Sequence, residues 1–330
     1  MGLLRRVKAL LRSRRLFRNW LSLGIRYQLV RYGLIKGNNL LTAICRDGNT
    51  SLIEPQVYGF IANVYYDGLI AGYDCGSKSV VLTNGSKLPL NRLHEIVGIK
   101  YGWFFNGDCW FKGGIMFKAM RWPIIETFEL NQYNVIDVRG RVVVDVGAFV
   151  GDSAIYFALK GARKVYAIEP HPEAYEEMLM NISLNGLGDK IMPINIAVGR
   201  NGVVCISPDN DITSANVTYS MTEVECSGTR VRSIRLGDLI QKYSIEPDVL
   251  KMDCEGCEYD VIMNDYDAVK LFKELVFEYH AYATGRPVSE LLRALSRDFK
   301  CEFVNEGFLQ KYQPRYKREE LGMIHCINID

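Results

Sequence analysis

Short apolar runs alternate with amphipathic stretches of helical spacing through the second half of the chain. Val142, Val143 and Val144 form a β-branched run that suits a strand buried on both faces of a parallel sheet. The pattern predicts strands at 142–145, 165–169, 192–198, 249–253, 274–279, 301–305 and 324–329. It predicts helices at 152–160, 172–185, 236–243, 257–265 and 288–298, with a β-rich insertion at 203–235. Such alternation favours an α/β fold with helices on both faces of the sheet.

The first part of the chain has a different pattern, and we divide it at about residues 35 and 120. Residues 1–35 are a basic helical arm, residues 36–120 a small β-rich region, and residues 121–330 the α/β domain, which a helix at 122–130 introduces. In the β-rich region Val57–Tyr66, Ser79–Thr83 and Trp103–Phe105 are predicted strands, and Asn106 and Gly107 a tight hairpin turn.

The arm is strongly basic. Eleven Lys and Arg residues and no acidic residue precede Asp47, although the net charge of the chain is only +2. Arginines interrupt its apolar residues, so we expect neither a signal peptide nor a membrane span. Two interpretations stay open: an amphipathic helix on an anionic membrane surface, or a helix that packs on the body with its arginines in water. Nucleic acid is not expected as a partner, because no base-reading module accompanies the arginines.

Nine cysteines are scattered along the chain. The odd number, without a secretory signal, favours reduced thiols and a cytoplasmic protein, with peripheral membrane contact as an addition. Cys254 and Cys257 form a C-x-x-C pair, but a zinc site needs a second pair of ligands. We therefore expect no metal site, and no redox role for the pair.

A glycine turn follows the first strand of the α/β domain. The segment reads D-V-G-A-F-V-G-D-S, with Asp145 at the strand end and Gly147 and Gly151 where the chain turns. Strand, glycine turn and helix form a nucleotide-binding unit, but the spacing differs from the dinucleotide fingerprint G-x-G-x-x-G. Glu169, at the end of the next strand, is placed to accept hydrogen bonds from two ribose hydroxyls. Asp145 would repel a pyrophosphate and suits an ammonium group, which favours S-adenosylmethionine over a nicotinamide cofactor.

A second motif, V-L-K-M-D-C-E-G-C-E, occupies Val249–Glu258. Asp253 ends a buried strand, where open α/β sheets bind ligands. Glu255 and Glu258 follow closely, and three neighbouring acids repel one another unless a cation, a proton or hydrogen bonds offset them. A purely structural interpretation has Glu255 capping the next helix and Glu258 stabilising its first turn.

These strings, together with A-I-E-P and L-V-F-E-Y-H, resemble the FkbM family of S-adenosylmethionine-dependent methyltransferases. The likeness covers about residues 120–330. It implies a class I methyltransferase (Rossmann-like) fold with a seven-stranded sheet whose last strand is antiparallel. It also implies O-methylation of a hydroxyl on a sugar, a glycan or a glycosylated or lipid-linked small molecule.

The resemblance assigns roles to single residues. Asp145, Gly147 and Gly151 should border the methionine end of the cofactor, with Ser153 bonding its carboxylate. Glu169 should hold the ribose, and Asn195 or Ala197 should lie near the adenine.

Transfer to an alcohol benefits from a general base, for which the candidates are Asp253, Glu255 and His280. His280 has the most suitable intrinsic pKa, although a single histidine is as often structural. Two alternative functions stay open: a non-catalytic binding module of methyltransferase fold, and a nicotinamide-dependent oxidoreductase.

Overall fold

A computed structural model describes residues 3–35, 40–207, 212, 226–304 and 311–329. The chain divides into two compact units, Met1–Ile115 and Met116–Asp330. The basic arm and most of the β-rich region therefore share the first unit.

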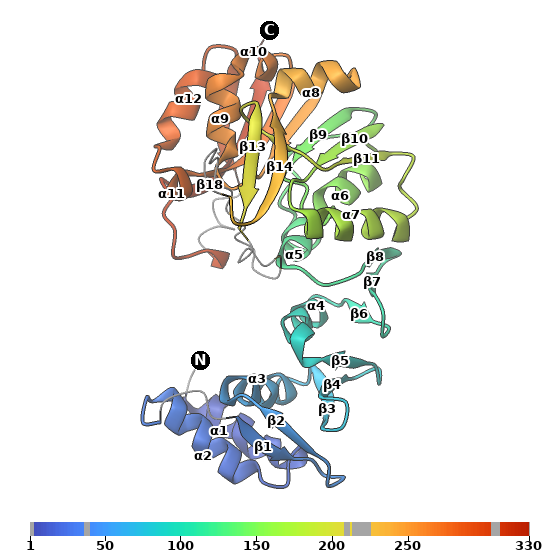
Figure 1. Cartoon of the computed structure of the whole chain (residues 1–330), viewed down its shortest axis with the longest axis vertical. Helices are drawn as coiled ribbons and strands as arrows, with labels where there is room; N and C mark the ends of the chain where they lie inside the picture. The colour runs from blue at the N-terminus through green and yellow to red at the C-terminus, as the bar shows by residue number, and fades with distance from the viewer. Residues whose placement is uncertain (1–2, 36–39, 208–211, 213–225, 305–310, 330) are drawn as a thin grey trace. The chain divides into compact units, whose positions relative to one another are not determined.

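The first unit combines short helices with small sheets (Figure 1). Its helical segments are α1 (Leu3–Arg12), η1 (Ser13–Arg15), α2 (Trp20–Arg31), α3 (Pro55–Tyr66), η2 (Leu90–Ile96) and α4 (Val97–Lys100). Its strands are β1 (Leu41–Ile44), β2 (Thr50–Ile53), β3 (Ile70–Asp74), β4 (Ser79–Leu82), β5 (Lys87–Pro89), β6 (Phe104–Phe105) and β7 (Trp110–Lys112), and β8 (Ile115–Phe117) crosses the boundary. They pair as β1-β2, β3-β4-β5 and β6-β7-β8.

The predicted strand at Val57–Tyr66 is wrong, because this segment forms helix α3. Pro55 stands in its first turn, where a missing N–H costs nothing. Tyr58, Ile61 and Ala62 are buried at helical spacing, and α1 and α2 pack against the helix. Aromatic and β-branched residues favour a strand locally, but the burial of one helical face decides the structure.

The predicted hairpin turn at Asn106 and Gly107 is present, but the connection is longer than this residue pair. Phe105 pairs with Trp110, so the connection between β6 and β7 is four residues long. The side chain of Asn106 accepts the backbone N–H groups of Asp108 and Cys109. A backbone hydrogen bond from the Asn106 N–H to the Cys109 carbonyl, at 3.1 Å, closes the same connection.

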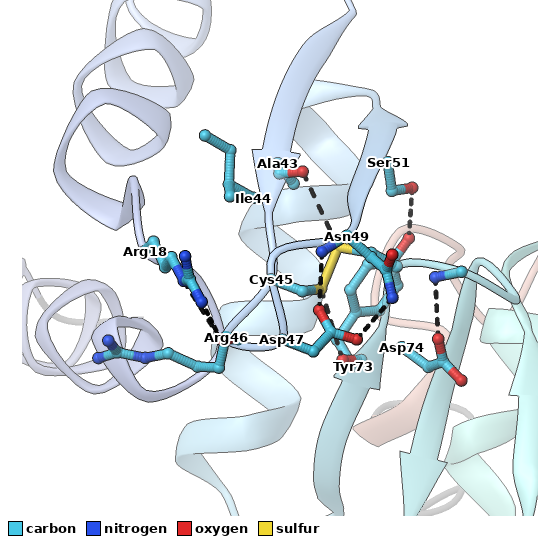
Figure 2. Close-up of a disulfide and its surroundings, with 12 residues drawn as sticks. Arg18, Ala43, Ile44, Cys45, Arg46, Asp47, Asn49, Ser51, Tyr73 and Asp74 are labelled. Atoms are coloured by element: carbon cyan, nitrogen blue, oxygen red, sulfur yellow. Dashed lines mark hydrogen bonds between the residues drawn. A yellow bond between two sulfur atoms is a disulfide. The ribbon is translucent and has the colours of Figure 1, made fainter.

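A disulfide between Cys45 and Cys75 ties the end of β1 to the end of β3 (Figure 2). Beside it, the hydroxyls of Ser51 and Tyr73 are 3.0 Å apart. The bond closes a separation of 30 residues, for which restriction of the unfolded chain contributes about 3–4 kcal/mol.

Three more disulfides lie in the second unit: Cys205–Cys226, Cys254–Cys257 and Cys301–Cys326. All cysteines except Cys109 are thus disulfide-bonded, and the expectation of reduced thiols is wrong for these eight. Spacing along the chain could not show which thiols meet after folding. No helix among the described residues is long and apolar enough to cross a membrane.

The second unit is built on a seven-stranded sheet of order β11-β10-β9-β15-β16-β18-β17. The strands are β9 (Val142–Val146), β10 (Lys164–Ile168), β11 (Ile191–Ile194), β15 (Val249–Met252), β16 (Glu274–His280), β17 (Phe299–Val304) and β18 (Leu321–Asn328). All neighbours are parallel except β18, which is antiparallel to both β16 and β17. This is the class I methyltransferase arrangement, which confirms the predicted fold class.

Helices cover both faces of this sheet (Figure 1). They are α5 (Trp122–Phe128), α6 (Asp152–Leu159), α7 (Pro172–Leu184), α8 (Leu236–Tyr243), α9 (Cys257–Asn264), α10 (Tyr266–Val269), α11 (Ala281–Thr284) and α12 (Val288–Leu295). α8, α9 and α12 share one apolar core with the sheet, and α6 and α7 pack against β9, β10 and β11.

The predicted strand at 192–198 is divided in the structure. β11 ends at Ile194, and β12 (Ala197–Val198) joins β13 (Gly202–Ile206) and β14 (Thr229–Ile234) in a small separate sheet. The last two strands confirm β-structure in the insertion, whose residues 208–211 and 213–225 lie outside the described ones.

Candidate active site

The glycine turn after β9 packs directly against the second motif. Gly147 has φ +76°, and a Cβ there would lie 1.9 Å from the backbone oxygen of Asp253. Gly151 has φ +85° and leads into α6. Only glycine fits at position 147, so this residue allows the ends of β9 and β15 to meet.

A cavity of about 280 Å³ lies at the carboxyl ends of β9, β10 and β15, within the second unit. Of the candidate site residues, those that line it are Gly147, Ser153, Glu169, Ala197, Asp253 and Glu255. Asp145, Gly151, Asn195 and His280 are not part of its lining.

Glu169 lies at the cavity wall directly after β10. One carboxylate oxygen accepts the N–H of Phe149 at 2.9 Å, and the other accepts the N–H of His171 at 2.7 Å. A carboxylate oxygen can accept more than one hydrogen bond, so these two contacts do not by themselves prevent Glu169 from accepting a ligand hydroxyl. The geometry therefore suits the ribose role.

Asp145 lies behind the wall rather than facing a ligand. It is fully buried; Lys251 Nζ is 2.9 Å from its Oδ1, and the Ser153 hydroxyl donates to its Oδ2 at 2.7 Å. The expected contacts of Asp145 with an ammonium group and of Ser153 with a carboxylate are replaced by this internal pairing.

Lys251 is a site residue that sequence reasoning missed. Its ammonium group also donates to the Gly147 carbonyl at 2.7 Å, and the residue lines the cavity. Burial lowers the pKa of Lys251, but the charges of Asp145 and Asp253 outweigh burial and raise it above its usual value. The sequence did contain an indication of this role, because Lys251 is the single charged residue in the otherwise apolar strand V-L-K-M.

Asn195 supports the site from outside. Its side-chain amide donates to the backbone oxygens of Glu169 and Pro170, at 2.9 and 3.1 Å. It therefore holds the segment that presents the carboxylate, whereas Ala197 lines the cavity.

Two more carboxylates, Asp253 and Glu255, line the cavity just after β15. The Tyr133 hydroxyl donates to Asp253 Oδ2 at 3.3 Å, and the Tyr282 hydroxyl donates to Glu255 Oε2 at 2.9 Å. Glu255 has φ +56°, an unusual backbone conformation for a residue with a side chain. Strained backbone of this kind concentrates at functional sites.

His280 lies behind these carboxylates at the end of β16 and is almost fully buried. Its Nδ1 is 3.2 Å from Glu258 Oε1, and its Nε2 is 3.6 Å from Glu255 and 3.8 Å from Asp253. Burial lowers the pKa of His280, but the charges of Glu258 and Glu255 outweigh it and hold the pKa well above the usual value. A raised pKa favours the protonated ring, so His280 is a poorer proton acceptor than its intrinsic pKa suggests.

Further acids near the cavity also escaped sequence reasoning. Burial raises the pKa of Asp152 to about 7 and that of Glu126 to about 8. Burial, together with the charge of Asp253, raises the pKa of Glu278 well above its usual value. These three acids come from separate helices and strands, so no local sequence motif predicts that they lie near the cavity. Among the described residues, no three His, Cys, Asp or Glu side chains form a group that could hold a metal ion.

One known protein family matches the part of the chain that contains both the glycine turn and Asp253. Residues 145–303 match the methyltransferase FkbM domain. This segment belongs to the FkbM methyltransferase family. S-adenosylmethionine is therefore the cofactor of the FkbM domain, and the Gly147 turn and the Glu169 carboxylate fit its methionine and ribose parts.

Two curated relatives match parts of the chain. Hexuronic acid methyltransferase AglP of Haloferax volcanii is 26% identical over 153 residues, which are 46% of this chain and 61% of that protein. Ribosomal protein L11 methyltransferase of Carboxydothermus hydrogenoformans is 51% identical over 55 residues, which are 17% of this chain and 18% of that protein. The matches thus span less than two thirds of either relative.

Among solved structures, an O-methyltransferase from Bacillus cereus in complex with SAH aligns with 59% of this chain and 77% of its own. The identity is 11% and the TM-score is 0.35.

Proposed function

We propose that this chain is an S-adenosylmethionine-dependent O-methyltransferase that acts on a hydroxyl of a sugar, a glycan or a glycosylated or lipid-linked small molecule. The observation that supports this best is one cavity that is lined both by Glu169, the candidate ribose ligand, and by the Asp253 and Glu255 carboxylates. The name of the relative AglP, a hexuronic acid methyltransferase, supports a sugar acceptor.

S-adenosylmethionine supplies a methyl group on a sulfonium, which leaves as a neutral thioether. The protein has to orient the acceptor hydroxyl and remove its proton. Orientation of two reactants contributes several kcal/mol, and a general base about 10²–10⁴-fold in rate.

We assign the base to Asp253. It follows β15, lines the cavity and has a side chain that is 30% exposed, whereas His280 is almost fully buried, is not part of the lining and has a raised pKa. His280 Nε2 lies 3.8 Å from Asp253 Oδ1. Glu255 is a second acceptor for hydroxyls of the substrate, because hydroxyl groups donate readily to carboxylates.

Replacement of Glu169 by alanine should weaken binding of S-adenosylhomocysteine. Two hydrogen bonds to a charged acceptor contribute about 1.5–3 kcal/mol each, so we expect a loss of about 10²-fold or more. Isothermal titration calorimetry measures the dissociation constant. The matched control is Glu173→Ala, in the exposed first turn of α7, which should keep wild-type affinity. Wild-type affinity in Glu169→Ala would refute the ribose assignment.

We also propose that the basic arm docks on an anionic membrane surface. Leu4, Val7 and Leu11 form an exposed apolar stripe on α1, and Lys8 and Arg12 are exposed beside it. A helix that packed only on the protein would bury this stripe. Attachment would concentrate the enzyme where lipid-linked acceptors reside.

A variant with Leu4, Val7 and Leu11 all changed to serine should bind anionic vesicles about tenfold more weakly than the wild type. Each nearby Lys or Arg contributes about 1 kcal/mol, so wild-type binding should also weaken steeply with rising salt. Co-sedimentation with phosphatidylserine vesicles measures both effects. Leu271→Ser, an equally exposed leucine of the second unit, is the control. Equal binding by the triple variant, or no binding by the wild type, would contradict membrane docking.

A further inference from the structure

The disulfide Cys254–Cys257 lies in the wall of the cavity. Both cysteines line it, and they enclose Glu255 and Gly256 between β15 and α9. No other disulfide of the described residues has both cysteines in that lining.

This bond closes a much shorter loop than the others do. Its cysteines are 3 residues apart, whereas the other disulfides span 21, 25 and 30 residues. The stabilisation that a disulfide provides by restricting the unfolded chain grows with loop length, so Cys254–Cys257 stabilises the folded protein least of the four. Both cysteines border the cavity and Cys257 is partly exposed, whereas Cys45 and Cys75 are both buried and do not line it.

The surroundings favour the reduced form. Cys254 Sγ lies 3.4 Å from Glu258 Oε1, a fully buried carboxylate oxygen. The sulfur of a disulfide has no proton to share with this oxygen, but a thiol donates a hydrogen bond to it. Cys257 is the first residue of α9, and a helix N-terminus stabilises a thiolate. Stabilising the reduced form makes a disulfide easier to reduce.

We propose that Cys254 and Cys257 are a reversible thiol–disulfide pair that controls methyl transfer. A thiolate of a dithiol reductant attacks Cys257 Sγ, and the sulfur–sulfur bond of the protein breaks. The electron pair of that bond passes to Cys254 Sγ, which takes up a proton and donates a hydrogen bond to Glu258. The second thiol of the reductant then displaces Cys257. The reductant becomes a disulfide, and its two electrons and two protons end on the cysteine pair.

The bond acts on the site through Glu255 and Gly256. They have φ +56° and +116°, and the closed ring restrains them there. That conformation keeps Glu255 within 2.9 Å of the Tyr282 hydroxyl and 3.6 Å of His280 Nε2. When the ring opens, Glu255 leaves this conformation and its contacts with Tyr282 and His280 are lost, so the oxidised form is the active one. This effect on turnover rests on the proposed function, whereas the thiol chemistry does not.

The test is a redox titration of the full chain in dithiothreitol buffers. Free thiols are alkylated at each ratio of reduced to oxidised dithiothreitol and assigned by peptide mass spectrometry. Cys254 and Cys257 should become alkylated at a ratio about tenfold lower than the one that opens Cys45–Cys75. Alkylation only together with Cys45 and Cys75, or only in denaturant, would overturn the proposal whatever the substrate is.

Turnover is measured on the same samples. Reduction should lower kcat by about 10- to 100-fold, and reoxidation should restore it. The double variant Cys254→Ser, Cys257→Ser should have the kcat of the reduced enzyme, and reductant should not change that kcat. The matched control Cys45→Ser, Cys75→Ser should keep the wild-type titration of the cavity pair. A pair that opens readily with unchanged kcat would overturn its control of transfer.

Discussion

Asp253→Asn should lower turnover by about 10²–10⁴-fold while cofactor binding survives. The amide keeps the shape of the carboxylate and can still accept the Tyr133 hydroxyl, which lies 3.3 Å away. It has no charge to pair with His280 and no basic oxygen for the proton of the acceptor. The rate is measured as transfer of labelled methyl to an acceptor found in a screen of sugars and glycans, and affinity for S-adenosylhomocysteine is measured by calorimetry.

The control for this variant is Asp267→Asn. Asp267 is a surface residue of α10, in an exposed pair with Lys270, and its replacement should leave both quantities within about twofold. Wild-type turnover in Asp253→Asn would remove Asp253 as the base and leave Glu255 as the remaining carboxylate. Loss of cofactor binding in that variant would instead indicate that Asp253 holds the cofactor.

Lys251→Met should destabilise the second unit by about 3–5 kcal/mol. The change leaves Asp145 fully buried without its cationic partner and removes the hydrogen bond to the Gly147 carbonyl. Urea unfolding followed by circular dichroism should show an earlier midpoint. The loss should shrink at low pH, because Asp145 in the variant can take up a proton and become neutral.

The matched control is Lys270→Met. Lys270 Nζ lies 2.7 Å from Asp267, but both side chains are exposed, so the cost should stay below about 1 kcal/mol. Equal stability of wild type and Lys251→Met would show that the fold does not depend on a cationic partner for Asp145.

The sequence predicted the large sheet well because its strands are buried on both faces and its turns need glycine. Gly147 is a clear case: its positive φ and its contact with Asp253 leave no other residue possible. Glu169 was predictable from its place at a strand end. The helix at Val57–Tyr66 was not, because its aromatic residues suit either structure until the partners α1 and α2 are known.

The partners of charged groups could not be predicted in the same way. Asp145 was expected to face a ligand, but Lys251, 106 positions later in the chain, neutralises it from the neighbouring strand. His280 was a candidate base by its intrinsic pKa, and the carboxylates around it come from separate elements. Pairings of this kind depend on distances in space, which local patterns do not contain.

The position of β18 has a consequence for synthesis of the protein. This strand lies between β16 and β17, which do not pair with each other although both are made before it. A nascent chain on the ribosome therefore carries two unpaired strand edges until residues 321–328 have emerged, and such edges invite pairing with other chains. Closure of the sheet is thus a late event, and a chain stopped before residue 321 would be a substrate for chaperones or proteases.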